Sequence, residues 1–232
     1  MNVLSRDFTP NEAAYLANAC LAVTAEERVG ADLSVAIDCG AMIASARLVA
    51  KAGRVVSTGN VNKAIEEKIF KVKRKKVNLS RRYVSEAAVL YLASSKLLTA
   101  SLSKEMKVGV YKALSDWMKT LNDNGRVDSP VIMFSKHMVF NLNEDFDRWS
   151  TLVRLYARSK LEHIAVNPEI MGGLPVIKGT RVPVYTVLSM VDGGDSVADI
   201  CEDYPYLSKS AIEAAVIYAR AHPKTGRPKR FR

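Results

Sequence analysis

The sequence lacks the long apolar run that a membrane-spanning helix requires. None of its hydrophobic stretches approaches the roughly 20 residues that cross a bilayer. The N-terminal segment MNVLSRDFTPNEAAYLANAC carries acidic and polar residues where a signal peptide would need an apolar core. The chain of 232 residues is 48% hydrophobic and 25% charged, which is ordinary for a globular protein and argues against wholesale disorder. We therefore expect a cytoplasmic protein that does not enter a membrane.

Cysteine and histidine are scarce, and the few that occur are far apart. The three cysteines are Cys20, Cys39 and Cys201. Their odd number and wide spacing fit no metal-ligand pattern, so we interpret them as reduced thiols. The three histidines are His137, His163 and His222. Since the sequence shows no Ser-His-Asp grouping and no metal-ligand cluster, we predict no enzyme, no metal and no cofactor.

The stretch GGLPVIKGTRVPV, residues 172–184, is similar to a phosphate-binding loop in composition but not in spacing. Such a loop ends in Gly-Lys-Ser/Thr, whereas here Lys178 precedes Gly179 and Thr180. Two prolines within the stretch also remove N–H groups that would hold a phosphate. We therefore interpret it as a turn-rich segment in front of a helical unit.

Charge is distributed unevenly along the chain, whose formal net charge is +10. Residues 63–82 contain nine bases and two acids, whereas residues 162–219 contain eight acids and three bases. The last thirteen residues contain six bases and no acid. This distribution indicates at least two kinds of partner, of which one is anionic.

The N-terminal region, residues 1–100, follows the order of a winged helix-turn-helix: helix, helix, basic hairpin, helix. FTPNEAAYLA predicts a helix start with Thr9 as N-cap and Glu12 completing a capping box. STGNVNKAIEEKIF predicts a second helix capped by Ser57 or Thr58, KVKRKKVNLSRRYVS a two-stranded wing, and EAAVLYLASSKLL a further helix. Residues 20–55 interrupt this order with the strand-like DLSVAID and the helix-like AMIASARLVAKAG. They are either an inserted β-α element, which we favour, or a sign of another fold.

The polar and basic residues of this region are candidates for DNA binding. Asn62 and Lys63, with Asn60 beside them on the second helix, could reach base edges, where Asn matches adenine and Lys matches guanine. The hairpin bases would neutralise phosphates in a sequence-independent way. These bases are Lys71, Lys73, Arg74, Lys75, Lys76, Arg81 and Arg82. The alternative interpretation is a solvated strand that only aids solubility.

The sequence of residues 101–232 predicts two further units and a tail. Residues 101–160 form a middle α+β unit of helix, two short strands and helix, in which Phe146, Trp149 and Tyr156 are interpreted as core. Residues 161–222 predict a small hairpin and three short helices that begin at Pro183, Ser196 and Ser208. Residues 223–232 are a basic tail. The expected fold class is mainly α with short β-hairpins (α+β), with a trihelical helix-turn-helix-like unit near the C-terminus.

One family resembles the C-terminal unit closely over about 60 residues. NPEIMGGLPVIKGTRVPVYTVLSMVDGGDSVADICEDYPYLSKSAIEAAVIYARAHP contains the Gly-Gly-x-Pro, the Ile-x-Gly-Thr-Arg-x-Pro-Val, the Gly-x-Ser, the Tyr-Pro and the Leu-Ser of the domain of unknown function 433, DUF433. The resemblance implies a helix-turn-helix-like domain of bacterial VapB-type antitoxins, whose genes lie beside those of PIN-domain toxins. Longer members carry a MerR-like winged helix, which FTPNEAAYLA and NVNKAIEEKIF also resemble.

The basic tail has two functional interpretations besides plain disorder. GRP followed by further bases is similar to half an AT-hook, which would bind a DNA minor groove. By the resemblance to VapB-type antitoxins, the tail would instead cover the acidic site of a PIN-type nuclease, where arginines can pair with carboxylates. We favour toxin binding. The residues concerned are Arg227, Lys229, Arg230 and Arg232.

The resulting expectation is an antitoxin of a type II toxin-antitoxin system. It would inhibit a VapC-like, PIN-domain ribonuclease and bind operator DNA to regulate its own transcription, as a homodimer or a toxin–antitoxin hetero-oligomer. The alternative is a stand-alone helix-turn-helix transcription regulator without a toxin partner.

Overall fold

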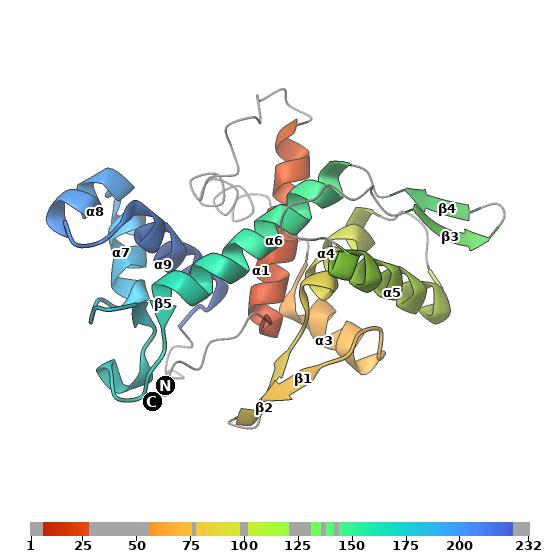
Figure 1. The fold of residues 1–232 in the computed structure, drawn as a ribbon, viewed down its shortest axis with the longest axis horizontal. Coiled ribbons are helices and arrows are strands. Elements are labelled where there is room, and N and C mark those ends of the chain that lie inside the picture. The colour runs from red at the N-terminus through yellow and green to blue at the C-terminus, as the bar shows by residue number, and fades with distance from the viewer. Residues whose placement is uncertain are drawn as a thin grey trace, which may run out of the picture.

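The computed structural model describes residues 7–27, 56–75, 78–97, 102–120, 131–135, 138–141 and 144–224. Within these ranges eight α-helices, one short 3-10 helix and three two-stranded antiparallel sheets make up the fold (Figure 1). The expected class, mainly α with short β-hairpins, is therefore confirmed. Of the predicted inserted element at residues 20–55, residues 20–27 continue the first helix, and residues 28–55 lie outside the described ranges.

In the described ranges between residues 7 and 97, three helices and a hairpin follow one another in the predicted order. Their bounds are α1 (Pro10–Glu27), α3 (Thr58–Glu66), β1 (Lys73–Lys75), β2 (Asn78–Tyr83) and α4 (Glu86–Leu97). The hairpin extends at its base, since Phe8 and Val84 exchange two backbone hydrogen bonds of 2.9 and 2.8 Å. This bridge joins the entry of α1 to the segment between β2 and α4.

The two predicted helix starts are confirmed. The Thr9 N–H donates to Glu12 Oε2 at 2.7 Å, and the Glu12 N–H donates to Thr9 Oγ1 at 3.3 Å. For α3 the cap is Ser57, whose side chain accepts from the Asn60 N–H while the Ser57 N–H donates to Asn60 Oδ1. Both motifs satisfy backbone N–H groups that a helix start leaves without partners.

The middle part contains α5 (Lys104–Thr120), β3 (Val131–Ser135), β4 (Met138–Asn141) and α6 (Glu144–His163). Helix α5 packs on α4. Helix α6 crosses the molecule and contacts α1, α4 and α9, so it joins the two halves (Figure 1). Phe146, Trp149 and Tyr156 are buried as predicted.

The C-terminal part is a hairpin followed by three helices. Its elements are β5 (Ile164–Ala165), η2 (Met171–Gly173), β6 (Val176–Ile177), α7 (Val184–Gly193), α8 (Val197–Asp203) and α9 (Lys209–Ala221). The helix starts predicted at Ser196 and Ser208 are confirmed: Ser196 forms a capping box with Asp199 at the start of α8, and Ser208 caps α9. Pro183 is the N-cap of α7 with an extended ψ of 138°, so this helix begins one residue later than predicted. Helix α9 packs on both α7 and α8.

The glycine-rich stretch in front of α7 uses its backbone N–H groups internally. The Gly173 N–H donates to Ile170 O, the Lys178 N–H to His163 O and the Thr180 N–H to Ile177 O. Gly172 and Gly173 have positive φ angles of 64° and 85°, which glycine adopts at little cost. The stretch is thus a turn-rich segment in which most N–H groups donate to groups of the protein, and its spacing differs from that of a phosphate-binding loop.

Buried side chains of all eight helices belong to one continuous hydrophobic cluster. Helix α6 supplies Trp149, Val153 and Tyr156 to it, and α9 supplies Ile212 and Val216. Helices of the predicted N-terminal, middle and C-terminal units therefore contribute to one core. None of the helices in the described part is long and apolar enough to span a membrane.

Candidate nucleic-acid interface

Helix α3 is fixed on α1 by a buried asparagine. Asn18 Nδ2 donates to Val56 O at 2.8 Å and to Ala14 O at 2.9 Å, while the Val56 N–H donates to Asn18 Oδ1 at 2.8 Å. At the surface, Thr58 Oγ1 donates to Asn11 Oδ1 at 2.9 Å. Val61 and Ala64 turn inward to complete the contact. The backbone entering α3 is thus held in register with α1.

The three predicted base-reading residues of α3 have different surroundings. Lys63 points to solvent, with 72% of its side chain exposed and Glu67 at 4.0 Å. Asn62 is half-buried, and its Oδ1 has no hydrogen-bond partner among the described residues. Asn60 Oδ1 accepts from the Ser57 N–H, so this side chain caps the helix. Lys63 is the most exposed member of the set.

The hairpin that follows α3 presents several basic residues. Lys73 is exposed on 67% of its side chain and pairs with Asp7 at 2.9 Å, while Arg82 is half-buried. The backbone of Arg74 lies opposite Arg82, and that of Lys75 opposite Asn78. Arg81 lies in β2, but side chains at positions 74, 75 and 81 are not described. Lys76 and the tail residues Arg227, Lys229, Arg230 and Arg232 lie outside the described ranges.

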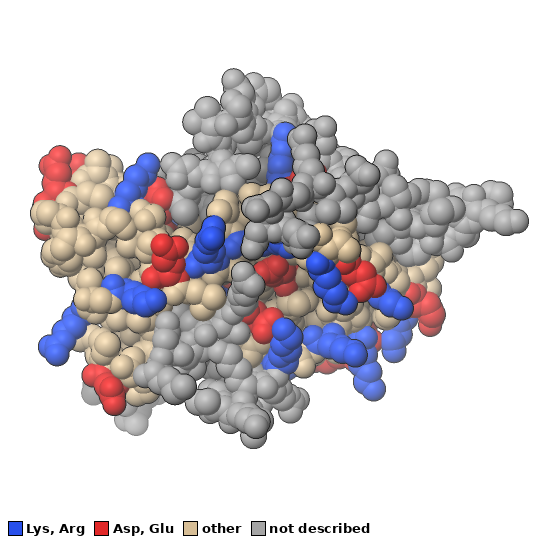
Figure 2. Space-filling view, viewed as in Figure 1, with Lys and Arg blue, Asp and Glu red and all other residues tan. Residues whose placement is uncertain are grey.

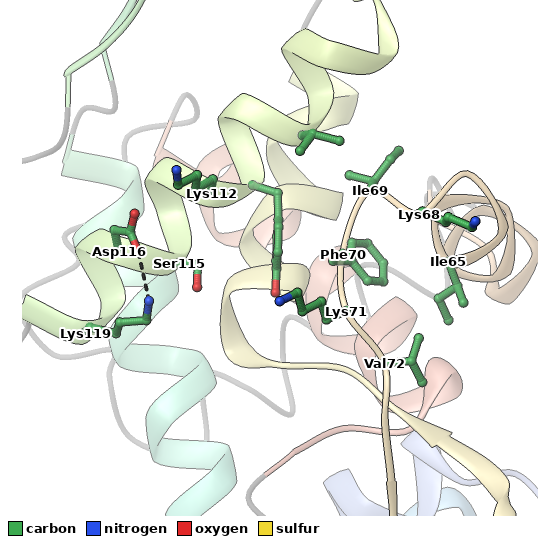
Figure 3. A pocket seen from close by; sticks show the side chains of 12 residues that line it. Ile65, Lys68, Ile69, Phe70, Lys71, Val72, Lys112, Ser115, Asp116 and Lys119 are labelled. Atoms are coloured by element: carbon green, nitrogen blue, oxygen red, sulfur yellow. Dashed lines mark hydrogen bonds and ion pairs between the residues drawn. The ribbon is translucent and has the colours of Figure 1, made fainter.

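A groove of about 870 Å³ lies between α5 and the segment that follows α3 (Figure 3). We call it the lysine groove. Its residues are Ile65, Lys68, Ile69, Phe70, Lys71, Val72, Val108, Tyr111, Lys112, Ser115, Asp116 and Lys119. Lys112 and Lys119 come from α5, and Lys68 and Lys71 come from the opposite side (Figure 3). The groove combines apolar walls with four cationic side chains.

One of these lysines has an unusual backbone conformation. Lys68 has a φ of 57°, which glycine adopts far more readily than lysine. The Ile69 N–H donates to Ala64 O and the Lys68 N–H donates to Ile65 O, which is the hydrogen-bond pattern of a Schellman helix end. Lysine thus occupies a position usually taken by glycine, at an energetic cost of about 1 kcal/mol.

A buried polar cluster, absent from the sequence predictions, joins α1, α6 and the end of α9. Glu12 Oε1 accepts from Lys160 Nζ and from Tyr156 Oη, both at 2.9 Å. Its Oε2 lies 3.5 Å from His222 Nε2. Glu12 and Lys160 are 2% and 3% exposed. Lys160 Nζ also donates to Asp7 O and lies 4.9 Å from the centre of the Phe8 ring.

The electrostatics of this cluster favour the charged form of Glu12. Burial alone would raise the pKa of this carboxyl group, but the hydrogen bond to His222 and the charge of Lys160 outweigh it. The pKa of Glu12 therefore lies well below its ordinary value. Burial and the neighbouring Glu12 charge raise the pKa of Tyr156 well above its usual range, so it donates as a neutral phenol. Because both charged groups are almost fully buried, we interpret the cluster as a structural connection.

The described residues contain no group of three or more His, Cys, Asp or Glu side chains that could hold a metal ion. Cys20 is buried, and burial raises the pKa of its thiol, whereas Cys201 is half-buried. Cys39 lies outside the described ranges. In the N-terminal part of the described chain, α3, the hairpin and the lysine groove present exposed cations to a partner.

The comparison with protein families concerns the C-terminal unit. Residues 164–219 match the family described as "Protein of unknown function (DUF433)". The C-terminal unit is a DUF433 domain. This confirms the resemblance seen in the sequence for that unit.

Two curated relatives match a similar length of chain. An uncharacterized protein of Sinorhizobium fredii, y4eO, is 46% identical over 70 residues, which are 30% of this chain and 32% of that protein. An uncharacterized protein of Mycobacterium tuberculosis, Rv2308, is 33% identical over 73 residues, or 32% of this chain and 30% of that protein. The chain thus matches about a third of the length of these relatives. No solved structure matches.

Proposed function

We propose that this protein binds operator DNA through α3 and the basic hairpin, in the manner of a MerR-like winged helix-turn-helix. The observation that carries the proposal is the order of α1, α3, hairpin and α4, with α3 fixed on α1 by Asn18. Lys63 on α3 and Lys73 on the hairpin extend to solvent from neighbouring elements. Lysines in this arrangement can contact base edges and phosphates.

Charge reversal in the hairpin tests DNA binding. The variant Lys73→Glu/Arg74→Glu/Lys75→Glu should weaken binding to duplexes of any sequence and reduce the salt dependence of the affinity, because fewer counterions are released. A matched control is Arg158→Glu/Lys178→Glu/Arg181→Glu, which makes the same charge change on exposed residues of α6 and the DUF433 domain. Fluorescence anisotropy between about 50 and 200 mM salt measures both quantities. Equal losses in the two variants would reject the hairpin as the DNA contact.

We further propose that the chain is an antitoxin whose DUF433 domain and basic tail bind and inhibit a PIN-domain, VapC-like ribonuclease. The support is the DUF433 domain itself, which resembles the domain of VapB-type antitoxins, together with the six bases of the last thirteen residues. In this proposal the partner cleaves RNA and the present chain blocks it. Arginines of the tail would pair with carboxylates of the nuclease site.

Co-expression with the product of the neighbouring gene tests this second role. A stoichiometric complex that persists through size exclusion is expected, and the purified complex should show less ribonuclease activity than the partner alone. Deletion of residues 225–232 should weaken the inhibition of the ribonuclease. The deletion keeps Lys224, whose Nζ lies 4.6 Å from the centre of the Tyr185 ring. Two separate elution peaks would favour the alternative, a stand-alone transcription regulator. Full inhibition by the truncated chain would exclude the tail as the blocking segment.

A further inference from the structure

The two ends of the molecule carry opposite charge. Between Val182 and Ser208 the chain has five acids and no base, and Asp195, Glu202 and Asp203 are exposed. Helix α8 lies at one end of the long axis, whereas α3 and α5 lie toward the other (Figure 1). Figure 2 shows carboxylates at the α8 tip and, over the α3–α5 end, many basic side chains with some carboxylates among them. A molecule with this charge distribution attracts a second copy in an antiparallel orientation.

The acidic end also carries an exposed aromatic side chain. Tyr206, in the turn between α8 and α9, is 65% exposed, and its ring makes a T-shaped contact with Tyr204 at 6.0 Å. Glu202 and Asp203 precede it in the sequence and are also exposed. Large aromatic side chains that are exposed to solvent often anchor protein interfaces, and here carboxylates lie close to the ring in the sequence. We call Glu202, Asp203 and Tyr206 the α8 surface.

The lysine groove has complementary chemistry. Lys68, Lys71 and Lys112 are exposed and form no ion pair with a carboxylate of the described residues, whereas Lys119 pairs with Asp116 at 2.8 Å. Between them lie Tyr111 and Val108, the latter 36% exposed. Lys68 has a positive φ, a backbone conformation that is less strained for glycine than for lysine. The groove thus offers apolar walls for a ring and cations for neighbouring carboxylates.

We propose that the lysine groove of one copy receives the α8 surface of a second copy in an antiparallel, two-fold symmetric dimer. The two surfaces lie at opposite ends of one chain, so they cannot meet within it (Figure 1). A two-fold axis brings both groove–α8 contacts together at once and closes the assembly. The buried area then doubles, toward the roughly 1,200–2,000 Å² of a stable interface. Tyr206 supplies the apolar anchor, and Lys71 and Lys112 face Glu202 and Asp203.

This pairing can be tested by reversing the charge of each surface in a separate variant and then mixing the two variants. The full-length chain is used, after bound nucleic acid has been removed. The wild type should sediment as a dimer, at twice the 25.5 kDa of one chain, in about 0.1 M salt and weaken toward 1 M, where charges are screened within about 3 Å. Lys71→Glu/Lys112→Glu and Glu202→Lys/Asp203→Lys should each raise the dimer dissociation constant by roughly 100-fold, because both symmetric contacts become repulsive. A 1:1 mixture of the two variants should form a heterodimer, since both of its contacts again join opposite charges.

Two single substitutions, which disturb the monomer less than charge reversal does, test the dimer without the risk that the chain fails to fold. Tyr206→Ser removes the anchor from an exposed turn and should weaken the dimer at all salt concentrations. Lys68→Gly removes one groove charge while relieving the positive φ, so the monomer stays folded and the dimer weakens about tenfold. A monomeric wild type, reversed variants that dimerise normally, or variants that fail to recombine would each overturn the proposal. DNA is absent throughout, so the result does not depend on the proposed DNA binding.

Discussion

Glu12 links α1 to α6 and to the residue that follows α9. It caps the first turn of α1 and also accepts hydrogen bonds from Lys160 and Tyr156 on α6. A buried ion pair contributes little compared with a well-packed apolar pair, but removal of one partner leaves a charge in a medium that solvates it poorly. The stability of the fold should therefore respond more strongly to single than to paired substitutions here.

Lys160→Met should lower the free energy of unfolding by about 3–5 kcal/mol, because Glu12 loses its buried cation. Glu12→Gln/Lys160→Met should recover most of that loss, since neither buried charge remains. Urea denaturation followed by circular dichroism measures both values. Lys119→Met, which removes an exposed ion pair with Asp116, is the matched control and should leave the stability nearly unchanged. A double variant as unstable as Lys160→Met would show that shape, and not charge, dominates the cluster.

The depressed pKa of Glu12 also makes a prediction about acid unfolding. Above the ordinary pKa of 4.5 this carboxyl group is charged in both states, and its favourable interactions stabilise the fold in full. As the pH falls below 4.5, the unfolded chain takes up the proton first, so the stabilisation is lost toward the lower folded pKa. The wild type should therefore lose up to about 1.4 kcal/mol per pH unit more than Glu12→Gln in that range. Parallel pH profiles for the two proteins would contradict this assignment.

At the scale of the element, the hydrogen bonds of Asn18 fix the position of α3 on α1. Asn18→Ala leaves the buried N–H and C=O of Val56 without partners, which costs about 2–4 kcal/mol. It should also weaken DNA binding under native conditions, because α3 loses its fixed entry. Asn11→Ala is the matched control, since Asn11 contacts Thr58 of the same segment at the exposed surface. Urea denaturation and anisotropy measure the two effects. Equal stability of both variants would show that Asn18 is not needed to seat α3.

The elements that could be predicted from the sequence are those fixed by nearby residues. The capping boxes at Thr9 and Ser196 join residues three apart, and the predicted strands and helices follow local periodicity and turn residues. Glu12 was expected only as a cap, because its other partners are 144 and 148 residues away in sequence. The groove was missed for a related reason: it exists only once α5 packs beside the segment after α3. The helix end at Lys68 could not be predicted from the sequence, because the residue that normally marks such an end is glycine.

At the scale of the whole molecule, α6 connects the DUF433 domain to the N-terminal helices. It contacts α9 on one side and α1 and α4 on the other, within one hydrophobic cluster. Units that share a core in this way lose their packing together, whereas units joined by a linker unfold independently. The shared core therefore favours a single cooperative transition over the separate transitions that limits at residues 100 and 160 would allow.

The two tryptophans allow this cooperativity to be measured, since Trp117 lies in α5 and Trp149 in α6, both buried. In Trp117→Phe the remaining fluorescence reports on α6, and in Trp149→Phe it reports on α5. In each variant we expect the fluorescence midpoint in urea to coincide with that of far-ultraviolet circular dichroism, which averages over all helices, α7–α9 included. A buried Trp→Phe change lowers the midpoint of both signals alike, so the comparison is made within each variant. A fluorescence transition that separates from the dichroism transition would mean that the α6 contacts with α1, α4 and α9 do not couple the DUF433 domain to the rest of the chain.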